Sequence, residues 1–160
     1  MKPNEIKPVT VSEVAMRMVM NVLWQRLPKK SFISGLWLRS FENTPLWPNC
    51  FLHILPIDKY PMFKYYYGNI ILATPGERGL WMQGSEEDRI QYALDIEEKS
   101  RGNATANWKA VHELEGDLII LYKREFPTTR GMFINYHYSL NEQQQIIGTL
   151  NRKFWSDFQK

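Results

Sequence analysis

The three histidines are the residues of this 160-residue chain that come closest to a recognisable chemical set. His53, His112 and His137 each fall in a different predicted strand, and imidazoles from neighbouring strands can meet at a metal ion. Their spacing does not place them on one side of a sheet, so no metal ligand and no cofactor is predicted. Adjacent residues of a strand point to opposite faces, so His112 and Glu113 are not an acid–base pair.

The carboxylate-rich stretches do not predict catalysis either. Residues 86–88 have the composition of a solvated turn, and Asp95, Glu97 and Glu98 belong to the polar face of a predicted strand or its end. Carboxyl acid–base catalysis needs two environments that separate the pKa values of a pair. The chain has no Gly-rich phosphate loop, no G-x-S-x-G and no H-E-x-x-H motif. The single Cys50 is expected to be a buried apolar side chain. No catalytic residue is predicted, and an enzyme ranks behind a ligand-binding protein and an interaction protein.

Composition limits the partners. The net charge is +3 and the Lys and Arg residues are scattered, which argues against nucleic acid. No run approaches the ~18 apolar residues of a membrane span. The first ten residues lack the apolar run of a secretion signal, so the sequence as it stands predicts a cytoplasmic protein. A chain whose signal peptide had been removed would look the same and would be periplasmic or secreted. Aromatic residues reach 14%, and such side chains line apolar pockets.

Two capping boxes predict a helix at each end of the chain. Thr10 and Glu13 open a helix over residues 10–27, after a tail of residues 1–9, and a second box at Ser139 opens a helix over residues 140–158. The first helix is apolar nearly all round, whereas a surface helix has an apolar face about 100° wide. We therefore expect a second contact for it. The chain is predicted to form a homo-oligomer that buries Met16, Met20 and Trp24, and the alternative is a helix packed wholly within its own chain.

Between the two helices, alternation of apolar and polar residues predicts strands joined by Gly/Pro-rich turns. The predicted strands cover residues 35–42, 50–55, 62–74, 80–83, 89–97, 107–114, 118–126 and 131–138. Eight antiparallel strands in up-and-down order have the right number to close into a small barrel. The sequence therefore predicts a mainly β fold, with the barrel at residues 35–138 of a single domain at residues 10–160. The alternative is an open sheet with helices on one face.

The start of the predicted barrel resembles that of the lipocalins. Gly35-Leu36-Trp37 follows an N-terminal helix and opens the first strand, as the G-x-W of lipocalins does. The run from residue 63 to residue 84, with its Pro75-Gly76 turn, resembles lipocalin-like (calycin-type) Bacteroidetes domains of unknown function. The lipocalin T-D-Y motif is absent, and Arg152 lies in a predicted helix instead of a last strand. The resemblance implies a barrel and no specific ligand.

A barrel rich in aromatic residues predicts non-catalytic binding of a small apolar or aromatic ligand in its interior. The wall residues on the expected inward phase are Trp37, Phe51, Phe63, Tyr65, Tyr92, Trp108, Tyr122 and Tyr136. A register slip of one residue would invert every member of this set. The alternative is an interaction or structural protein with a filled barrel that oligomerises through its N-terminal helix.

Overall fold

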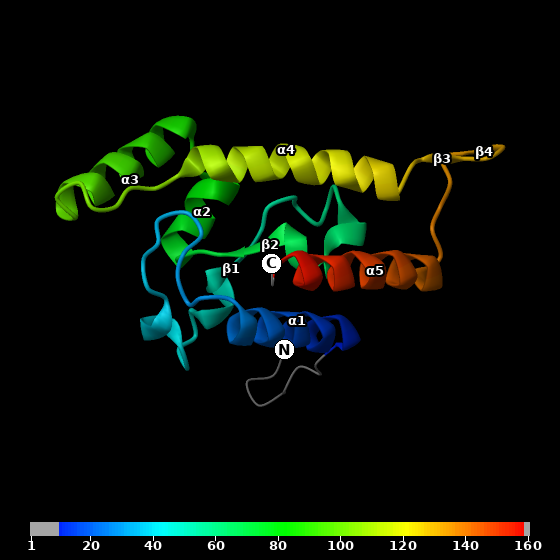
Figure 1. Ribbon diagram of the computed structural model, residues 1–160, viewed down its shortest axis with the longest axis horizontal. Coiled ribbons are helices and arrows are strands. Elements are labelled where there is room, and N and C mark those ends of the chain that lie inside the picture. The colour runs from blue at the N-terminus through cyan, green and yellow to red at the C-terminus, as the bar shows by residue number, and fades with distance from the viewer. Residues whose placement is uncertain (1–9, 159–160) are drawn as a thin grey trace, which may run out of the picture.

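The computed structural model describes residues 10–158, which contain five α-helices and two small antiparallel sheets (Figure 1). The mainly β prediction is wrong, because neither two-stranded sheet belongs to a barrel or to a larger open sheet. The resemblance to lipocalin-like domains is overturned by the same finding. The tail predicted at residues 1–9 lies outside the described residues.

Helices occupy most of the positions predicted as strands four to seven. They are α2 (Pro75–Gln83), α3 (Glu86–Lys99) and α4 (Trp108–Glu125). Thr74 caps α2 and Ser85 caps α3, each in a complete capping box with the third residue of its helix, and Asn107 caps α4. These side chains satisfy backbone N–H groups that a helix start leaves unpaired. The local signals for helix therefore outweigh the apolar alternation.

A buried two-stranded ribbon lies at the centre. β1 (Phe51–His53) pairs with β2 (Ile70–Leu72) in antiparallel register, and the two lie within the predicted second and third strands. Alternate residues of a strand point to opposite faces. Leu52 and Ile71 join a core with α4 and α5 (Leu140–Phe158), whereas Phe51, Ile70 and Leu72 join a second core with α1 (Val11–Arg26). The ribbon thus separates two apolar cores.

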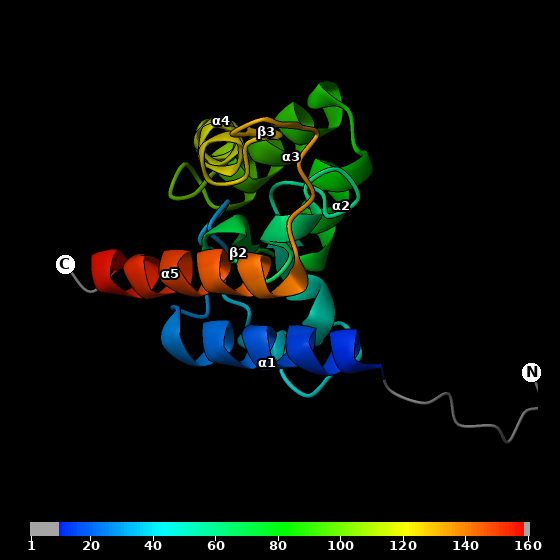
Figure 2. The ribbon, with the colours of Figure 1, turned by 90° about the vertical axis from the view of Figure 1, so that its right-hand side faces the viewer.

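The terminal helices lie side by side, with α5 between α1 and α4 in both views (Figures 1 and 2). Ile147 and Leu150 of α5 belong to the larger core, while Trp155 packs against the α1 core. The guanidinium of Arg26 lies 4.8 Å from the centre of the Trp155 ring. α5 therefore ties the two cores together. None of the described helices is long and apolar enough to cross a membrane.

The apolar face of α1 is covered largely by its own chain. Met20 and Trp24 are buried, and Met16 is half-buried against the same core. Trp24 contacts the rings of Trp47 and Phe51, and its indole N–H donates to the Glu42 carboxylate at 3.0 Å. Burial of these residues requires no second subunit, whereas Val11, Val14 and Met18 of the same helix stay exposed. A homo-oligomer through α1 therefore stays a prediction.

Candidate functional site

A cleft of about 620 Å³ lies where the end of β1 meets α2, α3 and α4. Its volume falls in the range of small-molecule sites, roughly 300–1,000 Å³. The cleft is lined by His53, Ile54, Pro56, Ile57, Asp58, Arg78, Trp81, Met82, Arg89, His112 and Glu115. The spacing of Arg78, Trp81 and Met82 along α2 places them on one helix face, since residues three and four apart are neighbours.

Trp81 forms a fixed aromatic wall. Its indole N–H donates to the carbonyl of Ile54 at 3.3 Å, and the edge of its ring meets the His112 imidazole at a centroid distance of 4.9 Å. A buried Trp whose N–H has a partner presents a large apolar surface with little loss of side-chain freedom on binding. This wall suits the flat or branched apolar part of a ligand.

Arg89 is anchored by the end of α2. Its Nη1 donates to the carbonyls of Leu80 at 3.0 Å and Gly84 at 2.9 Å at the C-terminal end of α2, where the helix dipole favours a cation. The Leu80 carbonyl also accepts from the backbone N–H of Gly84. Its guanidinium also lies 5.8 Å from the centre of the Trp81 ring. Within residues 10–158 its buried Nε has no hydrogen-bond partner. Nη1 of Arg89 is therefore used to hold the end of α2, and the charge of the guanidinium remains at the cleft.

Arg78 differs from Arg89, because its side chain has no hydrogen bond or ion pair within the part of the chain that the structure describes. The residue is half-buried and its Nε is fully shielded from solvent. A partly desolvated cation without a counter-charge is unfavourable. The positive charge of Arg78 therefore makes the cleft receptive to an anion.

His53 is held as a neutral imidazole. Its Nε2 lies 2.9 Å from the carbonyl oxygen of Lys64, which can only accept, so Nε2 carries the proton and Nδ1 remains an acceptor. Burial lowers the pKa of His53, and the charges of Arg78 and Lys64 lower it further against the opposing effect of the Lys64 hydrogen bond. The cleft thus offers a cation, a neutral acceptor and an aromatic wall.

The rim of the cleft carries acidic groups. Asp58 follows β1, and Glu115 of α4 lies 3.8 Å from the Nδ1 of His112, an ion pair when that histidine is protonated. The two carboxylates oppose the charges of Arg78 and Arg89. The formal charges of these four groups cancel, so an anion would be held by local contact with the unpaired Arg78 and not by a net charge of the cleft.

The structure brings His53 and His112 to the same cleft, but it places His137 in the connection between β4 (Phe133–Ile134) and α5. Among the described residues no group of three or more His, Cys, Asp or Glu side chains could hold a metal ion. His53 and His112 therefore share a cleft without a third side chain of the kind that a metal site would need among the described residues.

The eight aromatic residues expected on a barrel wall lie in separate places, and none lines the cleft. Phe63, Trp108 and Tyr122 belong to or pack on the larger core, and Phe51 belongs to the α1 core. Trp37 is exposed, with the Lys30 ammonium 4.3 Å from its ring centre.

Three of the eight are tyrosines whose hydroxyl groups form hydrogen bonds elsewhere in the structure. The hydroxyl of Tyr65 lies 3.0 Å from the Ser12 hydroxyl at the start of α1. Tyr92 donates to buried Glu77, and Tyr136 donates to Glu142 near the start of α5.

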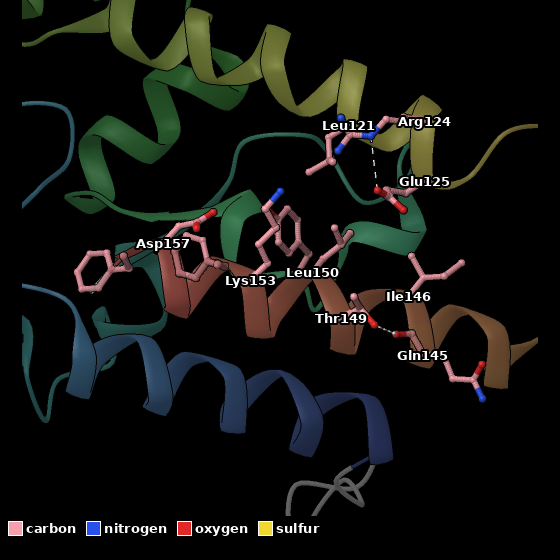
Figure 3. Close-up of a pocket in the computed structure, with 12 residues that line it drawn as sticks. Leu121, Arg124, Glu125, Gln145, Ile146, Thr149, Leu150, Lys153 and Asp157 are labelled. Carbon is pink, nitrogen blue, oxygen red and sulfur yellow. Dashed lines mark hydrogen bonds and ion pairs between the residues drawn. The ribbon is translucent and has the colours of Figure 1, made fainter. Parts of the chain in front are cut away.

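A second pocket, of about 720 Å³, lies between α4 and α5 (Figure 3). Its floor is apolar, with Leu121, Ile146 and Leu150 among its members. Its polar groups are largely occupied by one another, since Arg124 pairs with Glu125 at 3.5 Å and the Thr149 hydroxyl donates to the Gln145 carbonyl at 3.1 Å. Its lysine, Lys153, is exposed to solvent, whereas Arg78 of the cleft is half-buried, and the pocket contains no histidine. The cleft is therefore the better candidate.

No protein-family model, no curated protein and no solved structure matches the chain.

Proposed function

We propose that the protein binds a small organic monocarboxylate with an aromatic or branched apolar body, and that it does so without catalysing a reaction. The observation that carries the proposal is Arg78, a half-buried guanidinium at the cleft without an acceptor among the described residues. A bound carboxylate would supply the missing counter-charge through charge-assisted hydrogen bonds. The rest of the ligand would cover Trp81, Ile54 and Met82.

A non-catalytic role is favoured by the types of residue in the lining. It includes no hydroxyl, thiol or amine side chain that could act as a nucleophile. The Nε2 of His53 is engaged by a backbone carbonyl, and its lowered pKa makes the ring an acceptor and not an acid at neutral pH. These groups can orient a ligand, for instance by accepting a hydrogen bond at Nδ1.

The experiment is calorimetric titration with matched pairs of probes: phenylacetate against phenylacetamide, and 4-methylpentanoate against its amide. We expect the acids to bind at least about tenfold more tightly than the amides, because one charge-assisted contact contributes about 1.5–3 kcal/mol. Arg78→Met should remove this preference, and Arg78→Lys should restore part of it, because lysine keeps the charge but loses the planar fork.

Arg17→Met is the matched control, since Arg17 is an exposed arginine of α1 that does not line the cleft. It should leave acid binding unchanged. Equal affinity for acid and amide would refute the proposal, and so would acid binding that survives Arg78→Met in a variant whose circular dichroism shows it folded.

A further inference from the structure

The second hairpin carries three consecutive apolar residues at its end. β3 (Thr129–Arg130) and β4 pair with Arg130 opposite Phe133, which leaves Gly131 and Met132 as a two-residue turn. The φ of Gly131 is +63°, the left-handed value that the first position of such a turn requires. Figure 1 shows the hairpin extending beyond the end of α4, away from the helices.

The apolar side chains of this tip are exposed on both faces of the hairpin. The exposed fractions are 96% for Met132, 67% for Phe133 and 79% for Ile134. Residues paired across two strands share a face, so Phe133 lies on the face of Arg130 and Ile134 on the opposite face. A one-sided protein groove would cover only one of these faces. Surroundings that are apolar on every side would cover both.

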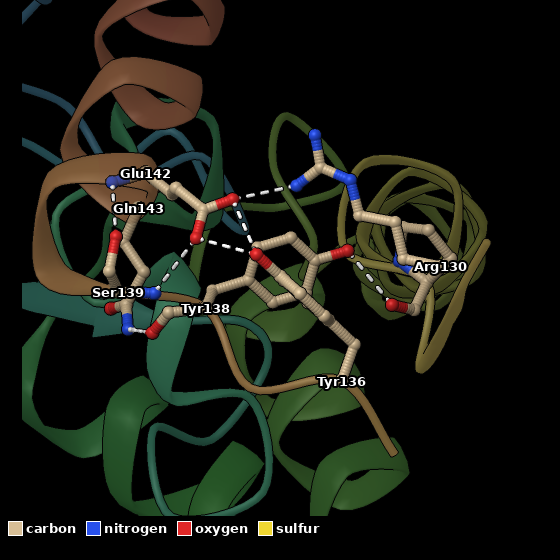
Figure 4. A network of polar contacts seen from close by, with 7 residues as sticks. Arg130, Tyr136, Tyr138, Ser139, Glu142 and Gln143 are labelled. Carbon is tan, nitrogen blue, oxygen red and sulfur yellow. Dashed lines mark hydrogen bonds and ion pairs between the residues drawn. The ribbon is translucent and has the colours of Figure 1, made fainter. Parts of the chain in front are cut away.

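A polar network holds the hairpin in this position (Figure 4). The Arg130 guanidinium donates to Glu142 at 2.7 Å, and the Tyr136 hydroxyl donates to the same carboxylate at 2.8 Å. The Tyr138 hydroxyl donates to the carbonyl of Pro127 at 2.8 Å. Ser139 and Glu142 cap each other's backbone at the start of α5. The tip is therefore presented by a preorganised base, which lowers the entropy cost of binding.

The charges around the base favour an anionic partner. Residues 126–141 include no carboxylate, and the last turn of α4 adds Lys123 and Arg124. The nearest acids along the chain, Glu125 and Glu142, are paired with Arg124 and Arg130, so the excess positive charge of this region is that of Lys123, which has no partner among the described residues. Tyr136 and Tyr138 follow the apolar tip, and tyrosine is enriched where an apolar phase meets water.

We propose that Met132, Phe133 and Ile134 insert into the interfacial region of an anionic lipid bilayer and hold the protein at its surface. The hairpin has only two paired positions on each strand, so many of its backbone N–H and C=O groups need other polar partners. The hydrocarbon core of a bilayer offers none, so we expect insertion to stop among the lipid headgroups. A second copy of the chain is a poorer occupant. Three side chains cannot supply the roughly 1,000 Å² that a specific protein interface buries.

The experiment is flotation of the full chain with vesicles of phosphatidylcholine containing about a quarter phosphatidylserine, beside vesicles of phosphatidylcholine alone. We expect binding to the mixed vesicles that weakens with added salt. The triple variant Met132→Ser, Phe133→Ser, Ile134→Ser should lower the partition coefficient at least ~10-fold, because interfacial binding scales with the apolar area inserted. Lys123→Glu should lower it by about fivefold or more on anionic vesicles alone.

The matched control replaces three exposed apolar residues on α1, by Val11→Ser, Val14→Ser and Met18→Ser. It should leave vesicle binding unchanged. A second readout uses Met132→Cys carrying an environment-sensitive dye, since Cys50 is buried and escapes labelling. Its emission should shift to the blue on mixed vesicles.

Three results would overturn the proposal: no binding to the mixed vesicles, equal binding by the triple variant, or no shift of the dye. Self-association in sedimentation that the triple variant abolishes, without vesicle binding, would assign the tip to a second copy instead.

Discussion

Replacing Glu77 by alanine should destabilise the protein far more than removing an equivalent exposed cap. Glu77 is fully buried at the third position of α2. One carboxylate oxygen accepts from the Ser31 hydroxyl and the Thr74 backbone N–H, and the other accepts from the Tyr92 hydroxyl at 2.7 Å. Burial, followed by the hydrogen bond to Glu77, raises the pKa of Tyr92, so its hydroxyl stays protonated and remains a donor.

The magnitude follows from the three donors that Glu77→Ala leaves behind. A buried donor without an acceptor costs about 1–3 kcal/mol, but the Ser31 and Tyr92 hydroxyls can turn toward other groups. We therefore expect a loss of about 3–5 kcal/mol in the free energy of unfolding, which lowers the melting temperature by about 10 °C. Asp88 is the control, because it holds the same capping-box position in α3 but is exposed. Asp88→Ala should cost about 1 kcal/mol or less.

Urea unfolding followed by circular dichroism at pH 7 measures both variants. The reasoning is refuted if the two losses agree within about 1 kcal/mol, since buried and exposed carboxylates would then be equivalent. A double-mutant cycle of Glu77→Gln with Tyr92→Phe isolates the hydroxyl contact, and residues in direct contact couple by about 0.5–3 kcal/mol. Additive losses in that cycle would contradict the hydrogen bond.

Two further predictions concern buried side chains. Burial raises the pKa of Cys50 to about 11, so the native thiol should resist thiol reagents at pH 8 until the protein is unfolded. Between pH 9 and 11 the thiol of the unfolded chain ionises while the thiol of the folded chain keeps its proton, so the free energy of unfolding should fall as the pH rises through this range. The fall should be smaller in Cys50→Ala, and urea unfolding at each pH measures both proteins. Met20→Lys should destabilise the single chain by about 3 kcal/mol or more and not release a monomer from an oligomer, because Met20 is buried in its own chain. The prediction would be wrong if the unmodified protein sedimented as a stable dimer and the Met20→Lys variant sedimented as a folded monomer.

The error in the predicted fold has a geometric cause that α3 shows well. Ile90, Tyr92, Leu94 and Ile96 alternate with polar residues, as in a half-buried strand. On a helix the same four residues form two pairs spaced four apart, and the pairs lie about 200° from each other. The structure has this arrangement, because Ile96 is buried and Tyr92 half-buried, whereas Ile90 and Leu94 are both 53% exposed. Alternation over seven residues therefore cannot separate a strand from a helix with apolar residues on two sides.

Capping residues carry the information that alternation lacks. Thr10 and Ser139 correctly predict the starts of α1 and α5, and the structure shows each accepting from the backbone of the third helical residue. The same pattern stands at Thr74, the last residue of a predicted strand, and at Ser85, which precedes residues predicted to form a turn. Residues 115–117 lie between two predicted strands, yet Gly116 lies inside α4, where a glycine costs only about 1 kcal/mol. The cap at Asn107 and the packing of α4 therefore outweigh one unfavourable residue inside the helix.

The residues of the candidate cleft depend on the same difference between strand and helix periods. Arg78 and Trp81 are three residues apart, so a strand would send them to opposite faces, whereas α2 places both on the cleft. His53 and His112 are 59 positions apart along the chain (112 minus 53), and only the packing of α4 beside the end of β1 joins them. No local pattern encodes that contact. A helical assignment of residues 75–83 would have supplied Arg78 and Trp81 as a pair, and the histidines would still have required the tertiary structure.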